Sequence, residues 1–490
     1  MIVVFVLGYA CIALEHPLHV NKAAVAILLG AIVWTLYACG DPATYPLVGG
    51  FEGLGEYIKH HPGMDFSSAF PAWLKEAFPQ VEGIQDYLKH NPDASSKGLF
   101  LSWMTNIPLI EHLGDVAQIL YFLMGAMTIV EIVDSHGGFR IVTDRIRTTR
   151  KATLLWIVAF IAFFMSAVLD NLTASIVMIT LLRKLISDKN DRWYFAGIVI
   201  LAANSGGAWS PIGDVTTIML WIRGKITEWH LVKETFLPSV VSVIVPLFIL
   251  SFTMKGNIAR PDEKSSDARR IDIKNWERNL VFFLGVGSLI FVPVFKAVTH
   301  LPPYLGMLAG LGVLWIVTGY IHRGRSERDA NALSVTHVLT RIDSSSILFF
   351  LGILMAVSAL QACGQLAALS ASLDQLPIGD PADSHTPAKY YLIVTIIGVL
   401  SAIVDNVPLV AGAMGMYSFP VDHYFWAFLA YAAGTGGSIL IIGSAAGVAV
   451  MGMEKIDFIW YLKRISWLAL VGYFAGCGTY VLQQVLSGGS

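Results

Sequence analysis

The tetrapeptides Asp170-Asn171-Leu172-Thr173 and Asp405-Asn406-Val407-Pro408 decide the fold, because each places a carboxylate inside a long apolar stretch. The first follows the apolar run 153–169, and the second follows the run 390–404. A charged side chain at the centre of a membrane-spanning helix costs about 2.5–3.5 kcal/mol on the insertion scale, so its presence there indicates a function. Two such carboxylates with the same neighbour predict a two-fold repeated ion site.

The composition is that of a polytopic membrane protein. Apolar residues make up 55% of the 490 residues and charged residues only 14%, and the mean hydropathy is +0.63. Soluble domains carry roughly 25% charged residues. The net charge of −2 gives no support for nucleic-acid binding, and the four cysteines lie within or beside apolar runs without metal-binding spacing. The sequence therefore predicts neither a disulfide framework, a zinc site nor a cofactor.

The apolar runs predict an all-α protein. Continuous spans are expected over 2–14, 22–39, 116–133, 231–253, 279–298, 304–321, 346–366 and 458–482. Removal as a leader peptide is the alternative for the first run. Segments 193–222 and 424–452 are expected to span with a glycine-rich interruption, whereas 152–182 and 388–416 are too long for one span. The last two are expected to be re-entrant hairpins, whose polar tips must be buried in protein or line a wet cavity.

Basic residues around the hairpins predict that these enter the membrane from opposite faces. Lys and Arg are dense at 140–151 and 183–192, on both sides of the first hairpin. Only Lys389 precedes the second hairpin, and no Lys or Arg lies between Asp405 and His423. Cytoplasmic loops carry the excess of Lys and Arg, so the first hairpin is expected to enter from the cytoplasm and the second from the other side.

The two halves of the chain also share a spacing outside the hairpins. Five positions correspond within one residue: Asp115, Ile119, Leu120, Gly125 and Gly137 with Asp343, Ile347, Leu348, Gly352 and Gly364. An inverted repeat with discontinuous helices indicates a secondary transporter with a site near the membrane midplane. The expected domains are a first inverted repeat at 1–255 with a periplasmic insertion at 40–114, a cytoplasmic linker at 256–278, and a second repeat at 279–490.

A polar, glycine-rich break follows each hairpin by some thirty residues. The first reads Asn204-Ser205-Gly206-Gly207 and is prolonged to Asp214, and the second reads Gly434-Thr435-Gly436-Gly437-Ser438. Gly206, Gly207, Gly436 and Gly437 would let a backbone approach an ion or a hairpin closely. Small-residue helix packing is the alternative explanation. Ser444 falls where Asp214 would recur, so the site is expected to be asymmetric.

The tips supply oxygen atoms, which a hard cation such as Na⁺ prefers. The expected Na⁺ ligands are Asp170, Asn171, Asp405 and Asn406, and Thr173 adds a hydroxyl that Pro408 lacks. Each aspartate could instead cap the half-helix that follows it, and capping is compatible with cation binding.

These motifs resemble the Na⁺/H⁺ antiporters of the NhaD type, within the ion transporter superfamily. The resemblance rests on the Asp-Asn tips, the two glycine-rich breaks and the opening Glu15…Asn21-Lys22-Ala23-Ala24, and it covers most of the chain outside 40–114. Relatives that carry dicarboxylates have Ser-Asn-Thr at both tips, whereas this chain has Asp in place of Ser. The resemblance implies an elevator-like homodimer, multi-pass in the bacterial inner membrane, that exports Na⁺ or Li⁺ against H⁺ in pH homeostasis and is not an enzyme.

The functional polar residues of that family fall, position by position, on twelve residues of this sequence. They are Asp170, Asn171, Thr173, Asn204, Asp214, Thr216, Thr217, Ser401, Asp405, Asn406, Thr435 and Ser438. Proton and Na⁺ are expected to compete for the paired carboxylates, and this competition would couple the two flows.

Two other functions remain open from the sequence. A sodium-coupled dicarboxylate or anion symporter of the same superfamily would need a cationic or helix-end cradle, and no Lys or Arg lies in the apolar core near the tips. An intramembrane aspartyl protease would need Tyr-Asp and Gly-x-Gly-Asp contexts. Here Leu169 precedes Asp170, and Pro211-Ile212-Gly213-Asp214 lacks the first glycine.

Overall fold

The computed structural model describes residues 1–13, 20–41, 45, 57–58, 60–61, 66–77, 96–143, 146, 148–259, 273–375, 387–403 and 405–487. Among these residues, helices joined by turns and short connections form the whole structure apart from one isolated bridge between Arg150 and Asn257. Glu15 and most of the expected linker, 260–272, lie outside the described residues.

Contacts divide the chain into two compact units, which are described separately. The first comprises 1–120, 344–386 and 411–418, and the second comprises 121–343, 387–410 and 419–490. The boundaries of the expected repeats, 1–255 and 279–490, stay a prediction, as do the linker and the periplasmic insertion.

The helices of the first unit are α1 (Ile2–Ala13), α3 (Lys22–Cys39), α5 (Phe66–Ala77), α7 (Ser96–Asn106), α19 (Ser344–Ala362) and α20 (Gln365–Asp374), with the first part of α8 (Pro108–Ser135) and the last part of α22 (Asn406–Met416). The helices α3 and α19 pack through glycine: a Cβ on Gly30 would lie 2.7 Å from the carbonyl oxygen of Gly352. The indole of Trp34 donates to the Met355 carbonyl at 2.9 Å across the same contact. Asn21, from the opening motif, caps α3 by accepting from the amides of residues 23 and 24.

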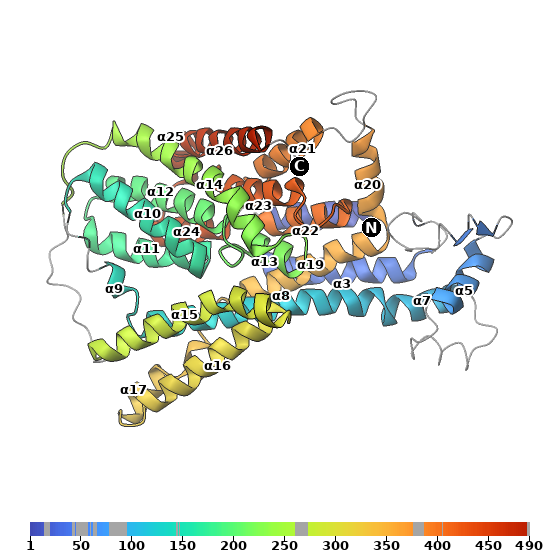
Figure 1. The fold of residues 1–490 in the computed structure, drawn as a ribbon, viewed down its shortest axis with the longest axis horizontal. Coiled ribbons are helices and arrows are strands. Elements are labelled where there is room, and N and C mark those ends of the chain that lie inside the picture. The colour runs from blue at the N-terminus through green and yellow to red at the C-terminus, as the bar shows by residue number, and fades with distance from the viewer. Residues whose placement is uncertain are drawn as a thin grey trace. The chain divides into compact units, whose positions relative to one another are not determined.

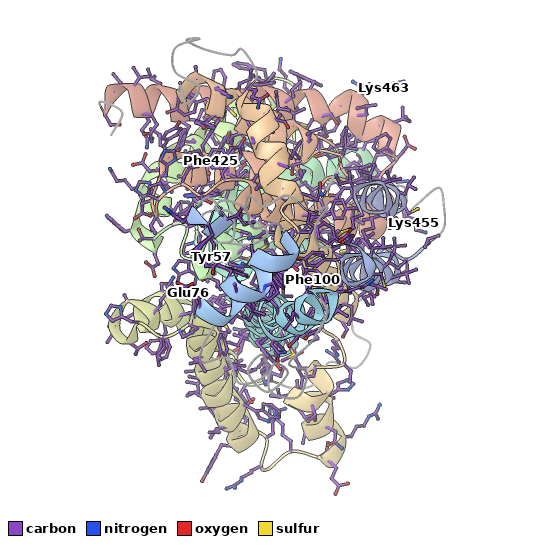
Figure 2. All side chains as sticks on the ribbon, turned by 90° about the vertical axis from the view of Figure 1, so that its right-hand side faces the viewer. Tyr57, Glu76, Phe100, Phe425, Lys455 and Lys463 are labelled. Atoms are coloured by element: carbon purple, nitrogen blue, oxygen red, sulfur yellow. The ribbon has the colours of Figure 1, made fainter. Side chains whose placement is uncertain are left out.

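Two short helices of the segment 40–114 pack through aromatic side chains. Phe70 and Trp73 of α5 contact Trp103 of α7, and Phe70 also contacts Phe100, which Figure 2 labels in this region. All four rings are buried. The position of this segment relative to the membrane stays a prediction.

The second unit contains the remaining helices (Figure 1). They are α9 (Arg140–Thr143), α10 (Lys151–Leu169), α11 (Asn171–Leu185), α12 (Lys189–Gly207), α13 (Val215–Ile222), α14 (Glu228–Ser251), α15 (Asn275–Thr299), α16 (Pro303–Ile321), α17 (Glu327–Ala332), α18 (Val335–Val338), α21 (Pro387–Leu400), α23 (Tyr424–Gly436), α24 (Ala445–Glu454), α25 (Phe458–Arg464) and α26 (Ser466–Leu486). Helix α12 packs against α10 and α11, α23 packs against α21, and α14 packs against α26.

The helices confirm a polytopic membrane protein. Among the described residues, seven helices are long and apolar enough to cross a membrane, and eight if the bent pair α25–α26 counts as one span. All four segments that were expected to be interrupted contain two helices each: α10 and α11, α12 and α13, α21 and α22, α23 and α24. The breaks coincide with the Asp-Asn pairs and the glycine-rich stretches.

The expected continuous span at 458–482 was wrong. Helix α25 ends at Arg464 and α26 begins at Ser466, with a 50° bend between them. Ile465 at the bend is fully buried against Gly197 of α12, where an added Cβ would lie 2.7 Å from its side chain. The bend therefore seats Ile465 in the space that the glycine leaves, while Lys463 and Arg464 stay exposed.

Matched glycines end matched helices in the two halves. Gly137 follows α8 with φ +65°, and Gly364 follows α19 with φ +74°. The left-handed region favours glycine at the residue that terminates a helix. The shared spacing seen in the sequence thus includes two positions with the same backbone requirement.

Candidate ion-binding site

The first tip is a strained turn between two helices. Helix α10 ends at Leu169, α11 begins at Asn171, and Asp170 between them has φ +94°. A non-glycine residue in this region carries backbone strain that the surroundings must offset. The Asp170 carboxylate accepts from the backbone amide and the hydroxyl of Thr173, both at 2.8 Å. Asp170 therefore caps α11, which was one of its two expected roles.

The second tip is built differently. Helix α21 ends at Leu400 and α22 begins at Asn406. Asp405 accepts from the backbone amide of Val407 at 3.1 Å, and Pro408 offers no hydroxyl to match Thr173. The two carboxylates thus cap their helices with different partners.

The break after α12 ends in a second buried acid. Residues 208–214 join α12 to α13, and Asp214 caps α13 by accepting from the Thr216 amide at 3.1 Å. The corresponding break ends in Ser444, which caps α24 by accepting from the Gly447 amide at 3.1 Å. Asp214 and Ser444 are 2% and 4% exposed, so both caps lie in the interior of the unit.

Asp214 is the point where the two tips meet. The amide nitrogen of Asn171 lies 3.0 Å from Asp214 Oδ2, and that of Asn406 lies 3.3 Å from the same atom. Asn171 comes from the first tip and Asn406 from the second. All three side chains are buried, and Asp405 and Asp170 lie within electrostatic range of the Asp214 carboxylate.

Asn204 extends this cluster to the second break. Its Oδ1 accepts from Asn171 at 3.1 Å, and its amide nitrogen lies 2.9 Å from the hydroxyls of both Ser438 and Ser444. Asn204 is fully buried. One hydrogen-bonded network therefore joins residues of both tips and both breaks.

Three other expected site residues donate their hydroxyls to backbone carbonyls. Ser401 donates to Ala433, Thr435 to Tyr431 and Thr217 to Asp214, at 2.6–2.9 Å. Their hydroxyl oxygens keep lone pairs that can accept or bind a cation.

Ser166 and Ser444 were not among the expected site residues. The hydroxyl of Ser166 donates to the Ala203 carbonyl at 2.6 Å, as that of Ser401 donates to Ala433. The signal was present in the sequence, because Ser166 precedes Asp170 by the same four residues as Ser401 precedes Asp405.

The glycines of the breaks do permit close backbone approach. A Cβ on Gly206 would collide with the carbonyl oxygen of Phe163 in α10, and one on Gly436 with that of Gly398 in α21. A Cβ on Gly437 would lie 2.9 Å from the Gly443 carbonyl oxygen. Each break is therefore pressed against the first helix of its hairpin, where only glycine fits.

The cluster supplies oxygen atoms of the kind that a hard cation prefers. The ion pairs among the described residues include neither Asp170 nor Asp214. Within the same residues, no group of three or more His, Cys, Asp or Glu side chains is arranged to hold a metal. A cation here would be bound by amide, hydroxyl and backbone oxygens together with carboxylate, as Na⁺ prefers.

Comparisons with known proteins show the family to which the chain belongs. The sequence model of the citrate transporter family (CitMHS) matches residues 9–434. Sodium/proton antiporter 1 of Arabidopsis thaliana is 44% identical over 98% of this chain and 72% of its own length. Sodium/proton antiporter 2 of the same plant is 49% identical over 75% of this chain and 85% of its length. The Na⁺/H⁺ antiporter NhaD of Vibrio parahaemolyticus is 30% identical over 74% of this chain and 89% of its length.

These relatives are transporters, so the protease alternative is wrong. The family match covers more than half of the chain, and the resemblance to the NhaD type is confirmed by relatives of that name. The chain belongs to the citrate transporter family of the ion transporter superfamily, as an antiporter of the NhaD type.

Proposed function

We propose that the chain exchanges Na⁺ or Li⁺ for H⁺ across its membrane, and that the two tip aspartates together with Asp214 form the shared cation and proton site. One observation carries the proposal: the Asp214 carboxylate receives an amide from each tip, from Asn171 and from Asn406. A proton or a cation bound to this carboxylate would therefore change the hydrogen bonds of both tips. The relatives named as sodium/proton antiporters support the choice of ions.

The amides suggest how the site changes when Na⁺ arrives. Both amides face Asp214 with their nitrogen atoms, and an amide nitrogen donates a hydrogen bond but does not bind a cation. Na⁺ beside this carboxylate would therefore require Asn171 and Asn406 to turn their oxygens toward the ion. This rotation of the two side-chain amides would break both tip contacts to Asp214 and replace them with contacts to the ion.

Coupling follows from the charge of the site. Asp170, Asp214 and Asp405 interact electrostatically, and several negative charges close together in apolar surroundings are costly. Binding of either a proton or Na⁺ lowers that cost, so each loaded form can undergo the conformational step. The empty form, with its full negative charge, cannot undergo this step. Uncoupled movement of Na⁺ or H⁺ across the membrane is thereby prevented.

The architecture belongs to the same proposal. We infer two re-entrant hairpins, α10–α11 and α21–α22, in repeats of opposite orientation that provide alternating access by an elevator-like movement in a homodimer. The matched contacts support a repeat, since Ser166 and Ser401 brace their breaks in the same way. The unequal flanking charges support the opposite orientation.

The protein is a multi-pass membrane protein, and its particular membrane is a further prediction. The bacterial inner membrane and a role in pH homeostasis follow from the resemblance alone. Two of the relatives reported above come from a plant.

A sodium-coupled symporter for citrate or a similar anion is the second candidate, because the matching family model carries the description citrate transporter. The chemistry of the site disfavours it. Three carboxylates around the tips would repel a tricarboxylate, and a bound anion would need cationic partners.

Reconstitution into proteoliposomes that contain a pH dye separates the two candidates. Antiport predicts a dye response to a Na⁺ or Li⁺ gradient with no organic anion present. The variant Asp214→Asn should lose this response, and Asp329→Asn, the same change outside the site, should retain it. A wild-type response that requires citrate would contradict antiport and establish the symporter.

A further inference from the structure

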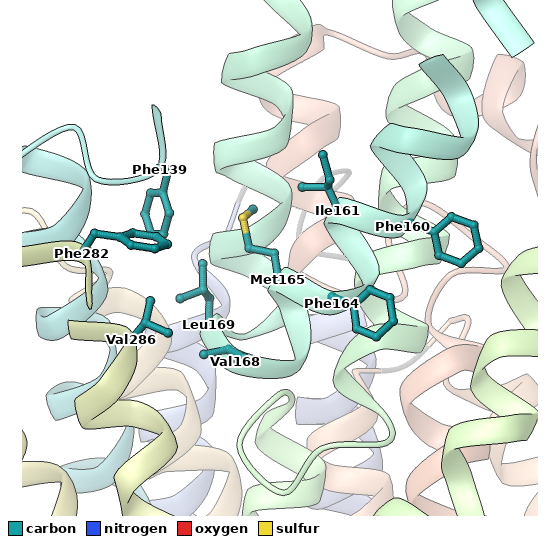
Figure 3. Close-up of a pocket in the computed structure, with 9 residues that line it drawn as sticks. All are labelled: Phe139, Phe160, Ile161, Phe164, Met165, Val168, Leu169, Phe282 and Val286. Atoms are coloured by element: carbon teal, nitrogen blue, oxygen red, sulfur yellow. The ribbon is translucent and has the colours of Figure 1, made fainter. Parts of the chain in front are cut away.

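An apolar cavity of about 360 Å³ lies beside the first hairpin, in the second unit. Met165, Val168 and Leu169 near the end of α10 form one wall, and Phe282 and Val286 of α15 form another, with Phe139 between α8 and α9 closing one end (Figure 3). None of these residues belongs to the ion-binding network. The cavity lining is almost entirely carbon, so its occupant must be apolar where it fits here.

The helices beside the cavity carry exposed apolar side chains. Helices α10 and α15 are both long and apolar enough to cross a membrane. The side chains of Phe164 on α10 and Phe283 on α15 are 51% and 66% exposed, which large apolar side chains tolerate when they face hydrocarbon. An acyl chain is the apolar occupant that such surroundings supply.

A smaller polar cavity of about 80 Å³ lies next to the apolar one, and Phe139 lines both. Its lining includes Arg140 at the start of α9 and Lys184 in the last turn of α11, with Asp134 and Thr180. The described lining of this cavity thus carries two basic side chains and one acid. Arg183, the neighbour of Lys184, is turned away into an ion pair with Glu454.

We propose that the two cavities together bind one anionic phospholipid, with its phosphate at Arg140 and Lys184 and an acyl chain between α10 and α15. Basic pockets between membrane helices on the cytoplasmic side suit the head groups of anionic lipids. The flanking charges already predict that this end of the hairpin faces the cytoplasm. The apolar and cationic parts lie in the order that a phospholipid presents them.

The site lies where a lipid can affect transport. Leu169 lines the apolar cavity and is followed directly by Asp170. A lipid chain packed on Leu169 would contact the turn that carries the tip carboxylate. Occupancy should therefore change the ease with which the hairpin moves, without contributing a ligand to the ion.

Native mass spectrometry of the purified protein tests the binding directly, independently of transport. We expect retention of phosphatidylglycerol over phosphatidylcholine with the same acyl chains. Each basic residue near the membrane contributes about 1 kcal/mol, so the double variant Arg140→Gln/Lys184→Gln should weaken phosphatidylglycerol binding roughly thirtyfold. The control Lys463→Gln/Arg464→Gln removes the same charge from exposed residues at the end of α25, of which Figure 2 labels Lys463, and should change binding little.

A second variant tests the apolar part. Val286→Trp fills the groove without changing charge and should also displace the lipid. A phosphatidylglycerol with a photoreactive group in its acyl chain should crosslink to peptides that contain Met165 or Val286. Equal retention of both lipids, equal binding by the two double variants, or crosslinks confined to other helices would overturn the proposal.

Discussion

The break between α12 and α13 and the break between α23 and α24 share their backbone contacts but differ in the charge of their side chains. In both, glycines press the chain against the first helix of a hairpin. A serine near the end of that helix, Ser166 within α10 or Ser401 just after α21, donates to the last turn of the broken helix. The first break carries Asn204 and Asp214. The second carries Gly434 and Ser444 at the positions that correspond by spacing.

The difference separates what the fold requires from what the ion requires. Close backbone approach recurs in both halves, so it belongs to the architecture. The acid occurs once, and its carboxylate is reached by the tips of both hairpins. Gly434 faces this acid, since a Cβ there would lie 3.7 Å from Asp214 Oδ2, in van der Waals contact. The backbone arrangement of the break therefore occurs twice, whereas the acid, Asp214, occurs in only one of the two breaks.

The largest difference between the breaks should come from their capping residues. Asp214→Asn should abolish exchange, because it removes the carboxylate that both tip amides contact while keeping the shape of the side chain. Ser444→Ala should leave measurable exchange, because it removes one neutral hydroxyl. Na⁺-dependent dye responses of the two variants at equal protein density in proteoliposomes check this. Equal activity of the two variants would refute the asymmetry.

The two tips should respond more alike than the two breaks. Asp170→Asn and Asp405→Asn should each reduce exchange at least on the order of a hundredfold, because neutral Asn cannot release a proton and a buried charge-assisted contact is worth about 3 kcal/mol. Both proteins should still reach the membrane, which immunodetection of membrane fractions can measure. Normal exchange by both variants would remove the tips from the ion site.

Asn204 should affect the apparent affinity for Na⁺ through its hydrogen bonds to the other site residues. Asn204→Ala leaves the amide of Asn171 and the hydroxyls of Ser438 and Ser444 without this partner. Unsatisfied buried groups cost about 1–3 kcal/mol, so the apparent affinity for Na⁺ should fall roughly five- to hundredfold. The variant Asn204→Asp, with a similar shape and an added charge, should instead shift the pH dependence of exchange. An unchanged Na⁺ affinity in Asn204→Ala would show that the network only supports packing.

Gly434→Ala should have the smallest effect. The added methyl group would lie 3.1 Å from the Cβ of Ala208 and near Asp214, so the neighbouring backbone must shift slightly. Overpacking of this size costs about 1 kcal/mol, and the Na⁺ affinity should fall less than about tenfold. Gly452→Ala in α24, where nothing lies within 4 Å of the new Cβ, is the matched control. A larger loss in the control than in Gly434→Ala would contradict the proposed contact with Asp214.

The positions of the breaks could be predicted from sequence, because polar residues and glycine stand out against long apolar runs. Asp170 lies between two helices as expected, and the helices resume at Asn171 and Asn406. The cost of burying a polar residue in an apolar segment depends on the residues next to it in the sequence. The sequence alone therefore indicates where such a segment is interrupted.

The hydrogen bonds within the site could not be predicted. Spacing does not reveal which atoms face each other, so the meeting of Asn171 and Asn406 at Asp214 was not foreseen, and Asp214 was left out of the expected Na⁺ ligands. The bend at Ile465 was missed for a related reason. It depends on Gly197, more than 250 residues away in the sequence, and the residues around Ile465 do not reveal that contact.

The dependence of the apparent KM for Na⁺ on pH tests the central claim, that proton and Na⁺ compete for the same carboxylates. Protons occupy the site at low pH, so the KM should be high there and fall as the pH rises. The fall should reach up to about tenfold per pH unit if one proton is displaced, since each unit changes proton binding by about 1.4 kcal/mol. Above the pKa of the site no proton competes, and the KM should level off. A KM that stays flat from about pH 6.5 to 9 with intact exchange would contradict the account, because separate proton and sodium sites would then be required.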